Sequence, residues 1–438
     1  MRLAPVVPPA ALAAGAIVAR ALMRNVPARL HADFTQPLVV ATNWGRFGAI
    51  TLTALVVALG IAAAPYVWSL RSQRAPSLAA LTLGATAALA AAWLMPVLFS
   101  SDVYAYAAYG ALANLGIDPY VRAPAVPHDT LLSAAAWQWG GALPVCVYGP
   151  AFVGLARSIV AAFSSLGSLA TLDALRAVAS LSLLACAPLA YAAFGGDERA
   201  KRLAAMTLVA NPVTLWCAAE GHNDALALAV ALTGVGLVRS GWFGLGAIVA
   251  AFSALFKLPG ILCTIGVAAI QRRARIGSAL GIILVAALCV PLFVGIASAL
   301  APNGHYLPQA SLQGAIAPIA GSAAAIAAAV AISATIALWG IRELRNGSSE
   351  GWIRLGLAGW ILIPNPYPWY SIWLLALAAI APQSRPGYVA ILFSFASLLR
   401  YVPDAVGPLS GAPAVAAGVT ASLPLCFLFI ARRAGLRA

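Results

Sequence analysis

Charged residues are scarce in this chain, and acidic ones are the scarcest. Only 12 of the 438 residues are Asp or Glu, 26 are Lys or Arg, and the four types together make up 9% of the sequence. Soluble domains are about a quarter charged and roughly half apolar, whereas this chain is 62% hydrophobic. The shortage of charge excludes an ordinary soluble protein and predicts an all-α polytopic membrane protein.

Cysteine and histidine are also rare, with six and four residues. Every cysteine except Cys146 lies in an apolar run, and none shows the paired spacing of a disulfide framework or a zinc site. We therefore expect no cofactor and no essential metal. Four carboxylates could still offer oxygen ligands to a magnesium or manganese ion, namely Asp102, Asp118, Glu220 and Asp224.

The net charge of +14 indicates topology and not a nucleic-acid partner. Its Arg and Lys residues stand in short clusters between apolar runs, such as Arg71–Arg74 and Arg199–Arg202. Clusters of this kind favour the cytoplasmic face and meet anionic lipid heads. With 71–74 in the cytoplasm, the long polar stretch at about 100–149 faces the other side. The remaining basic breaks predict roughly 10–12 membrane crossings.

The apolar runs predict one transmembrane domain over 47–438, preceded by a segment, 1–46, that forms a peripheral or weak first helix. The run at 150–166, interrupted by Arg157, is expected to be a re-entrant or interfacial piece.

The polar stretch opens with a carboxylate and several tyrosines. In a helix Asp102, Tyr106 and Tyr109 fall at i, i+4 and i+7 and share one face. One interpretation is a catalytic surface at the membrane boundary. The other is that Asp102 caps a helix and the tyrosines belong to an interfacial aromatic belt.

Two hairpins are too short to cross the membrane twice. About thirty residues separate Arg239 from Gln271, although each full span needs about twenty. The first hairpin must turn in or near the membrane around Lys257, which is costly there unless it meets an anion or snorkels to an interface. Three prolines at 364–368 interrupt the second hairpin, 352–382, and irregular backbone at this depth indicates a cavity.

A third polar site joins the two apolar runs between Arg202 and Arg239. Its side chains are Glu220, His222, Asn223 and Asp224, at the expected outer end of a hairpin. They form either an ordinary polar turn or a binding site for sugar hydroxyls and phosphate. Tyr148, Trp369 and Tyr370 are likewise either interface anchors or rings that stack on a sugar.

The order of these motifs resembles the polyprenol-phosphate-mannose-dependent α-1,6-mannosyltransferases, members of the GT-C superfamily of integral-membrane glycosyltransferases. The resemblance covers about residues 80–375 and rests on Ser101-Asp-Val-Tyr104, Gly116-x-Asp-Pro-Tyr120, Tyr148-Gly-Pro150, Asn211-Pro212, Gly221-His-Asn-Asp224, Lys257-x-Pro259 and Pro368-Trp-Tyr370. It implies a GT-C-type bundle with a catalytic first outer loop, in a bacterial inner membrane.

The resemblance implies the role of Asp102, and position and chemistry point to the roles of the other residues. Asp102 would be the general base on the outer face, and Lys257, His222 and His305 would meet the donor phosphate. Substrate contacts would come from Tyr106, Tyr109, Tyr148, Glu220, Asn223, Asp224, Trp369 and Tyr370. The partners would be a polyprenyl-phosphate sugar, a glycan or glycolipid acceptor and membrane lipids.

The chemistry agrees with these roles, because a lipid phosphate already leaves easily and the acceptor hydroxyl is the group that needs a base. Attack opposite the phosphate would invert the sugar. Two alternatives stay open. One is a transporter or flippase of lipid-linked saccharide, and the other is a related lipid-processing enzyme with a different sugar or a phosphate acceptor.

Overall fold

The computed structural model describes residues 75–93, 102–121, 145–300 and 311–398, together with 66, 70, 100 and 143. Within these residues every regular element is a helix and no strand occurs, as expected for an all-α polytopic membrane protein. The predicted N-terminal segment 1–46, His305 and the last apolar run, 412–431, lie outside the described residues.

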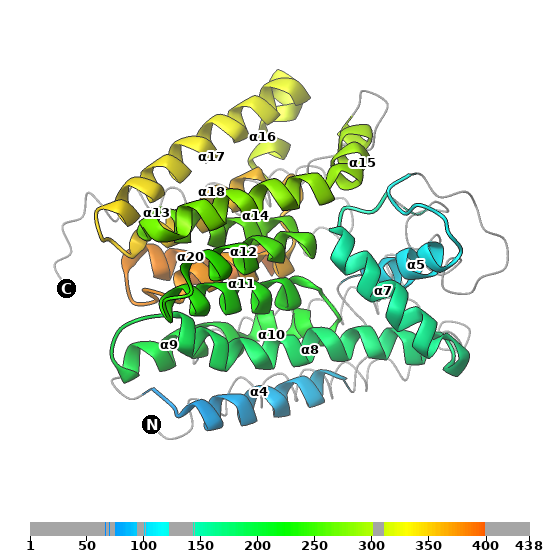
Figure 1. Cartoon of the computed structure of the whole chain (residues 1–438), viewed down its shortest axis with the longest axis horizontal. Coiled ribbons are helices and arrows are strands. Elements are labelled where there is room, and N and C mark those ends of the chain that lie inside the picture. The colour runs from blue at the N-terminus through cyan, green and yellow to red at the C-terminus, as the bar shows by residue number, and fades with distance from the viewer. Residues whose placement is uncertain are drawn as a thin grey trace.

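One layer of the bundle is built around the long helix α8. In Figure 1, α4 runs beside α8, and α9 to α11 lie next to it. The bounds are α4 (Leu78–Trp93), α8 (Ser168–Ala193), α9 (Glu198–Val209), α10 (Pro212–Ala219) and α11 (Asp224–Arg239).

The helices of the polar stretch lie at one end of this layer. There α5 (Asp102–Asn114) packs against α7 (Pro150–Phe163), which continues into η2 (Ser164–Leu166) (Figure 1). The segment 150–166 is thus a short apolar helix, and its expected re-entrant or interfacial position remains a prediction.

The second half of the chain stacks further helices on α11. In order, α11 packs on α12 and α12 on α14, while α17 packs on α18 and α18 on α19. The elements are α12 (Phe243–Phe252), η3 (Ser253–Leu255), η4 (Leu258–Gly260), α13 (Ile261–Ile270), η5 (Arg272–Ala274), α14 (Arg275–Leu288), α15 (Val290–Leu300), α16 (Leu312–Ala320), α17 (Ser322–Arg345), α18 (Glu350–Leu362), η6 (Pro368–Tyr370), α19 (Ser371–Ala378) and α20 (Arg385–Ala396).

Both short hairpins are confirmed. Helices α12 and α13 have ten residues each, about half of what a full span needs, and Lys257 lies in extended backbone between η3 and η4. Helix α18 ends at Leu362 and the chain regains helical form only at Pro368. Proline, which lacks the N–H that a helix interior uses, accounts for that break.

Among the described residues, α8 and α17 are long and apolar enough to cross a membrane. Two bent pairs would bring the number to four if each is one span: α10 with α11, bent by 115°, and Arg272–Leu288 with Val290–Ala297, bent by 60°. The helical stretch from Arg272 to Ala297 is therefore interrupted at Cys289. The total of 10–12 crossings stays a prediction.

Candidate active site

Asp102 is the first residue of α5. Its carboxylate is partly exposed and contacts two tyrosine side chains. Its N–H donates to Ser100 Oγ at 3.1 Å at the start of the helix. Its Oδ2 accepts from the phenols of Tyr106 at 3.4 Å and Tyr148 at 3.2 Å. The Asp102 side chain is 17% exposed, whereas both tyrosines are buried. The shared face of Asp102 and Tyr106 is confirmed.

The surroundings make this carboxyl a weaker acid than an ordinary aspartate. Burial raises the pKa of Asp102 above its usual value, and this effect outweighs the lowering by the Lys257 charge and the Tyr148 hydrogen bond. A carboxyl with a raised pKa that still ionises is suited to accept a proton.

The turn between α10 and α11 is buried within the protein, and its expected position at the outer end of a hairpin stays a prediction. Gly221, at φ +94°, lets the chain bend there. The side chains of Glu220, His222, Asn223 and Asp224 are all at most 4% exposed. Burying four polar groups is expensive unless they are paired or used.

His222 and Asn223 face the Asp102 cluster. His222 Nδ1 lies 3.6 Å from Asp102 Oδ2, and its ring stacks on Trp369 with 4.2 Å between centroids. Neither ring nitrogen has a hydrogen-bond partner among the described residues. Asn223 Oδ1 accepts from the Tyr106 phenol at 3.3 Å. The structure thus places His222 beside the expected base; its expected role at the donor phosphate stays a prediction.

Lys257 and Asp224, expected as separate substrate contacts, form a buried ion pair. Lys257 Nζ donates to Asp224 Oδ2 at 2.6 Å, and Asp224 Oδ1 accepts from Trp373 Nε1 at 2.8 Å. The ammonium also lies 4.7 Å from the ring centroid of Tyr370. Lys257 is 4% exposed, so it does not snorkel, and the anion it meets is Asp224.

Two expected substrate contacts are engaged within the protein. Glu220 Oε1 accepts from Trp216 Nε1 at 3.0 Å, one turn earlier in the chain. The Tyr109 phenol donates to the carbonyl of Val145 at 3.5 Å. Sequence reasoning missed Trp373, because nothing in the apolar run of α19 distinguishes an indole that holds a buried carboxylate.

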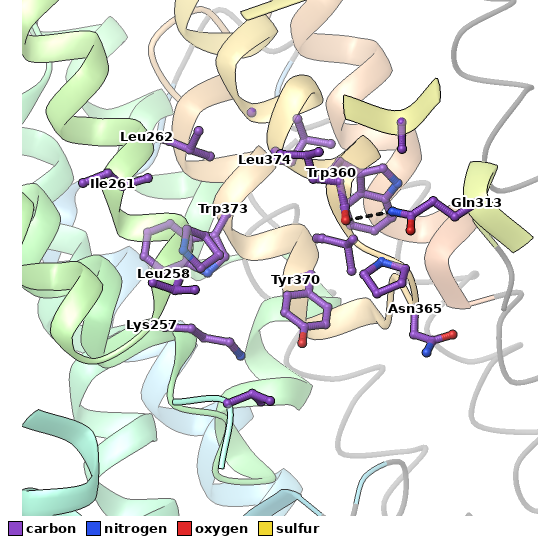
Figure 2. Close-up of a pocket in the computed structure, with 18 of the residues that line it drawn as sticks. Lys257, Leu258, Ile261, Leu262, Gln313, Trp360, Asn365, Tyr370, Trp373 and Leu374 are labelled. Carbon is purple, nitrogen blue, oxygen red and sulfur yellow. Dashed lines mark hydrogen bonds between the residues drawn. The ribbon is translucent and has the colours of Figure 1, made fainter. Parts of the chain in front are cut away.

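A cavity of about 630 Å³ opens beside Lys257. Figure 2 shows Lys257 and Tyr370 together, with apolar side chains from α13, α18 and α19 beyond them. Lys257 is the one charged residue among the described residues that line it, and the ring of Tyr148 contributes to the same wall. An apolar cavity bordered at one end by the Lys257–Asp224 pair fits a lipid with a polar head.

The carboxylates considered as metal ligands do not form a cluster in the part of the chain that the structure describes. No group of three or more His, Cys, Asp or Glu side chains there could hold a metal ion. Asp118 Oδ1 instead accepts from the N–H of Tyr120 within its own turn.

Comparisons with known proteins identify a matching family and a similar protein. The family described as "Alpha-(1->6)-mannopyranosyltransferase, N-terminal domain" matches residues 6–273, a range that contains Asp102, Tyr148 and Lys257. A Mycobacterium tuberculosis (strain ATCC 25618 / H37Rv) protein named Alpha-(1->6)-mannopyranosyltransferase A is 29% identical over 209 residues. That alignment spans 45% of this chain and 39% of the relative.

No solved structure shows a significant match. The family match, however, takes in more than half of the 438 residues. The chain therefore belongs to the alpha-(1->6)-mannopyranosyltransferase family.

Proposed function

We propose that this protein transfers a hexose, specifically mannose, from a polyprenyl-phosphate donor to a glycan or glycolipid acceptor at the outer face of the bacterial inner membrane. The observation that carries the proposal is the partly open Asp102 carboxylate, held by two phenols, with Lys257 and an apolar cavity nearby. The name of the M. tuberculosis relative supports mannose and an α-(1→6) product.

In the proposed reaction the acceptor hydroxyl attacks the anomeric carbon of the donor sugar. Asp102 takes the hydroxyl proton as the new C–O bond forms, and the bond to the lipid phosphate breaks with its electron pair on the phosphate. Attack from the side opposite the phosphate inverts the anomeric centre. Lys257 would stabilise the charge that grows on the departing phosphate.

The cavity would hold the prenyl chain of the donor. Each methylene removed from water contributes about 0.8 kcal/mol, so a chain in this apolar space would supply much of the donor affinity. The outer face is supported by the basic clusters, because the positive-inside rule puts them on the opposite side from the stretch that contains Asp102.

The test is a transfer assay with purified protein in lipid, radiolabelled polyprenyl-phosphate mannose and a mixed glycan acceptor pool. We expect Asp102→Asn to lower transfer by about 10² to 10⁴-fold, the usual contribution of a general base, while donor binding persists. Asp118→Asn is the matched control, because an amide oxygen can still accept from the Tyr120 N–H in that turn.

Full transfer by Asp102→Asn would refute the assignment of the base. If no polyprenyl-phosphate sugar supports transfer and vesicles containing Asp102→Asn still move lipid-linked saccharide across the bilayer, the protein is a flippase and the transferase proposal fails.

A further inference from the structure

Tyr148 lies between the Asp102 carboxylate and the apolar cavity beside Lys257. Its phenol donates to Asp102 Oδ2 at 3.2 Å. Its ring centroid lies 5.6 Å from Lys257 Nζ, and the same ring lines the apolar cavity. One residue therefore contacts the expected base and forms part of the wall where a lipid phosphate would lie.

The backbone fixes Tyr148 against the segment that carries Lys257. The N–H of Gly149 donates to the carbonyl of Phe256 at 3.2 Å. A Cβ on Gly149 would lie 2.0 Å from the carbonyl oxygen of Leu255, so only glycine permits this approach. The carbonyl of Tyr148 also accepts from the Tyr120 phenol at 2.9 Å. Tyr148 and Lys257 thus share one rigid support.

Two neighbouring rings pack against the Tyr148 side chain and against each other. Tyr106 and Phe152 meet it edge to face, with centroids 4.9 and 5.5 Å away. Such pairs favour this geometry over free rotation of the ring. The phenol is consequently aimed at Asp102 before any substrate binds.

From this arrangement we propose that Tyr148 is a positioning residue for Asp102, which keeps the carboxylate aimed and ionised for proton transfer. The proposal rests on the proposed function, since it assigns Tyr148 a role in that reaction. It replaces direct sugar stacking by Tyr148 with action through the carboxylate.

Other titratable groups also face Asp102, but among the described residues the Tyr148 phenol makes the shortest hydrogen bond to its carboxylate. Tyr106 of α5 is at 3.4 Å and is shared with Asn223, and His222 of the α10–α11 turn is at 3.6 Å. The charges of Lys257 and Asp224 act through space and are paired with each other. Tyr370 of η6 lies beside Lys257.

The expected pH dependence follows from the hydrogen bond. A hydrogen bond to the ionised carboxylate favours that form and lowers its pKa. Tyr148→Phe removes the donor and keeps the ring, so the pKa of Asp102 rises and the acid limb of kcat/KM moves to higher pH. Below the new midpoint, kcat/KM should fall about tenfold, as for the loss of one hydrogen bond to a charged group. The donor KM should change by less than about twofold.

The experiment is the pH profile of transfer by the full-length protein in lipid, for wild type, Tyr148→Phe and Tyr66→Phe. Tyr66 is the matched control, because it is buried and its phenol donates to the Thr207 carbonyl at 2.8 Å. We expect the control to keep the wild-type acid limb. A 3-fluorotyrosine at position 148, a stronger donor of the same shape, should move the acid limb to lower pH.

An unchanged acid limb in both position-148 variants, or equal loss at every pH, would overturn the positioning role. This outcome is distinct from failure of the proposed function, which appears as full transfer by Asp102→Asn. If Tyr148→Phe does not fold, the fluorotyrosine variant decides alone, because an unmoved limb there also overturns the proposal.

Discussion

As the proposed general base, Asp102 would make the activity of the protein depend on pH. Because burial raises the pKa of its carboxyl, the group is protonated over a pH range in which an ordinary aspartate is already ionised. A general base must be deprotonated, so transfer should be lost as the pH falls through this raised pKa. The acid limb of kcat/KM for the free enzyme is the measurement. A midpoint at the usual pKa of aspartate would show that another group limits the rate.

Variants of the Lys257–Asp224 pair should affect stability and activity differently. Removing one partner by Asp224→Asn or Lys257→Met leaves a buried, unpaired group and should cost about 3–5 kcal/mol of unfolding free energy in detergent. The double variant should recover most of this loss but transfer poorly, because it lacks the cation that we propose for the donor phosphate. Costs that simply add in the double variant would contradict the pairing.

An exposed ion pair supplies the control for these single and double variants. Glu198 and Arg202 lie 2.7 Å apart with side chains 53% and 34% exposed, so Glu198→Gln should change stability little.

Spacing along the chain predicts contacts within one helix but not between segments. Asp102 and Tyr106 are one turn apart, so helical periodicity was enough to place them on one face. Tyr148 reaches Asp102 across 46 residues, and Lys257 meets Asp224 across 33 residues. These contacts depend on how irregular segments dock, which local residue patterns do not encode.

At the scale of elements, the support beneath Tyr148 depends on a close backbone approach. Gly149→Ala would force a methyl group onto the Leu255 carbonyl, and overpacking of this kind costs about 1–3 kcal/mol. We expect a lower thermal midpoint and reduced transfer. Gly154→Ala in α7 is the control, since a Cβ there meets nothing within 4 Å and alanine favours a helix. Equal behaviour of the two variants would refute the tight docking.

The breaks in the helices were predictable because their causes are local. Proline cannot continue a helix interior, and segments of about fourteen residues cannot span a bilayer of about 30 Å, so both short hairpins followed from the sequence. The burial of the 220–224 turn within the protein could not be predicted from the sequence, because the same polar residues suit an exposed turn.

Over the whole molecule, the breaks meet at one place. The start of α5, the turn before α11, the Lys257 segment and η6 come from distant parts of the chain, yet they surround the same carboxylate and ammonium. Irregular backbone is tolerated at membrane depth where it packs on protein or lines a cavity. The place where these segments meet, beside the 630 Å³ cavity, is therefore the position that we assign to the candidate active site.

The proposed binding of the prenyl chain in the cavity beside Lys257 can be tested by filling the cavity. Ile326 of α17 lines it, so Ile326→Trp should occupy the space that we propose for the prenyl chain. Loss of about two methylenes of buried contact corresponds to roughly a tenfold rise in donor KM. The rise should appear with a long-chain donor and not with a short-chain prenyl phosphate mannose. Ile332 of the same helix is 36% exposed, and Ile332→Trp should leave both KM values unchanged. Equal KM changes for long and short donors would mean that the chain binds elsewhere.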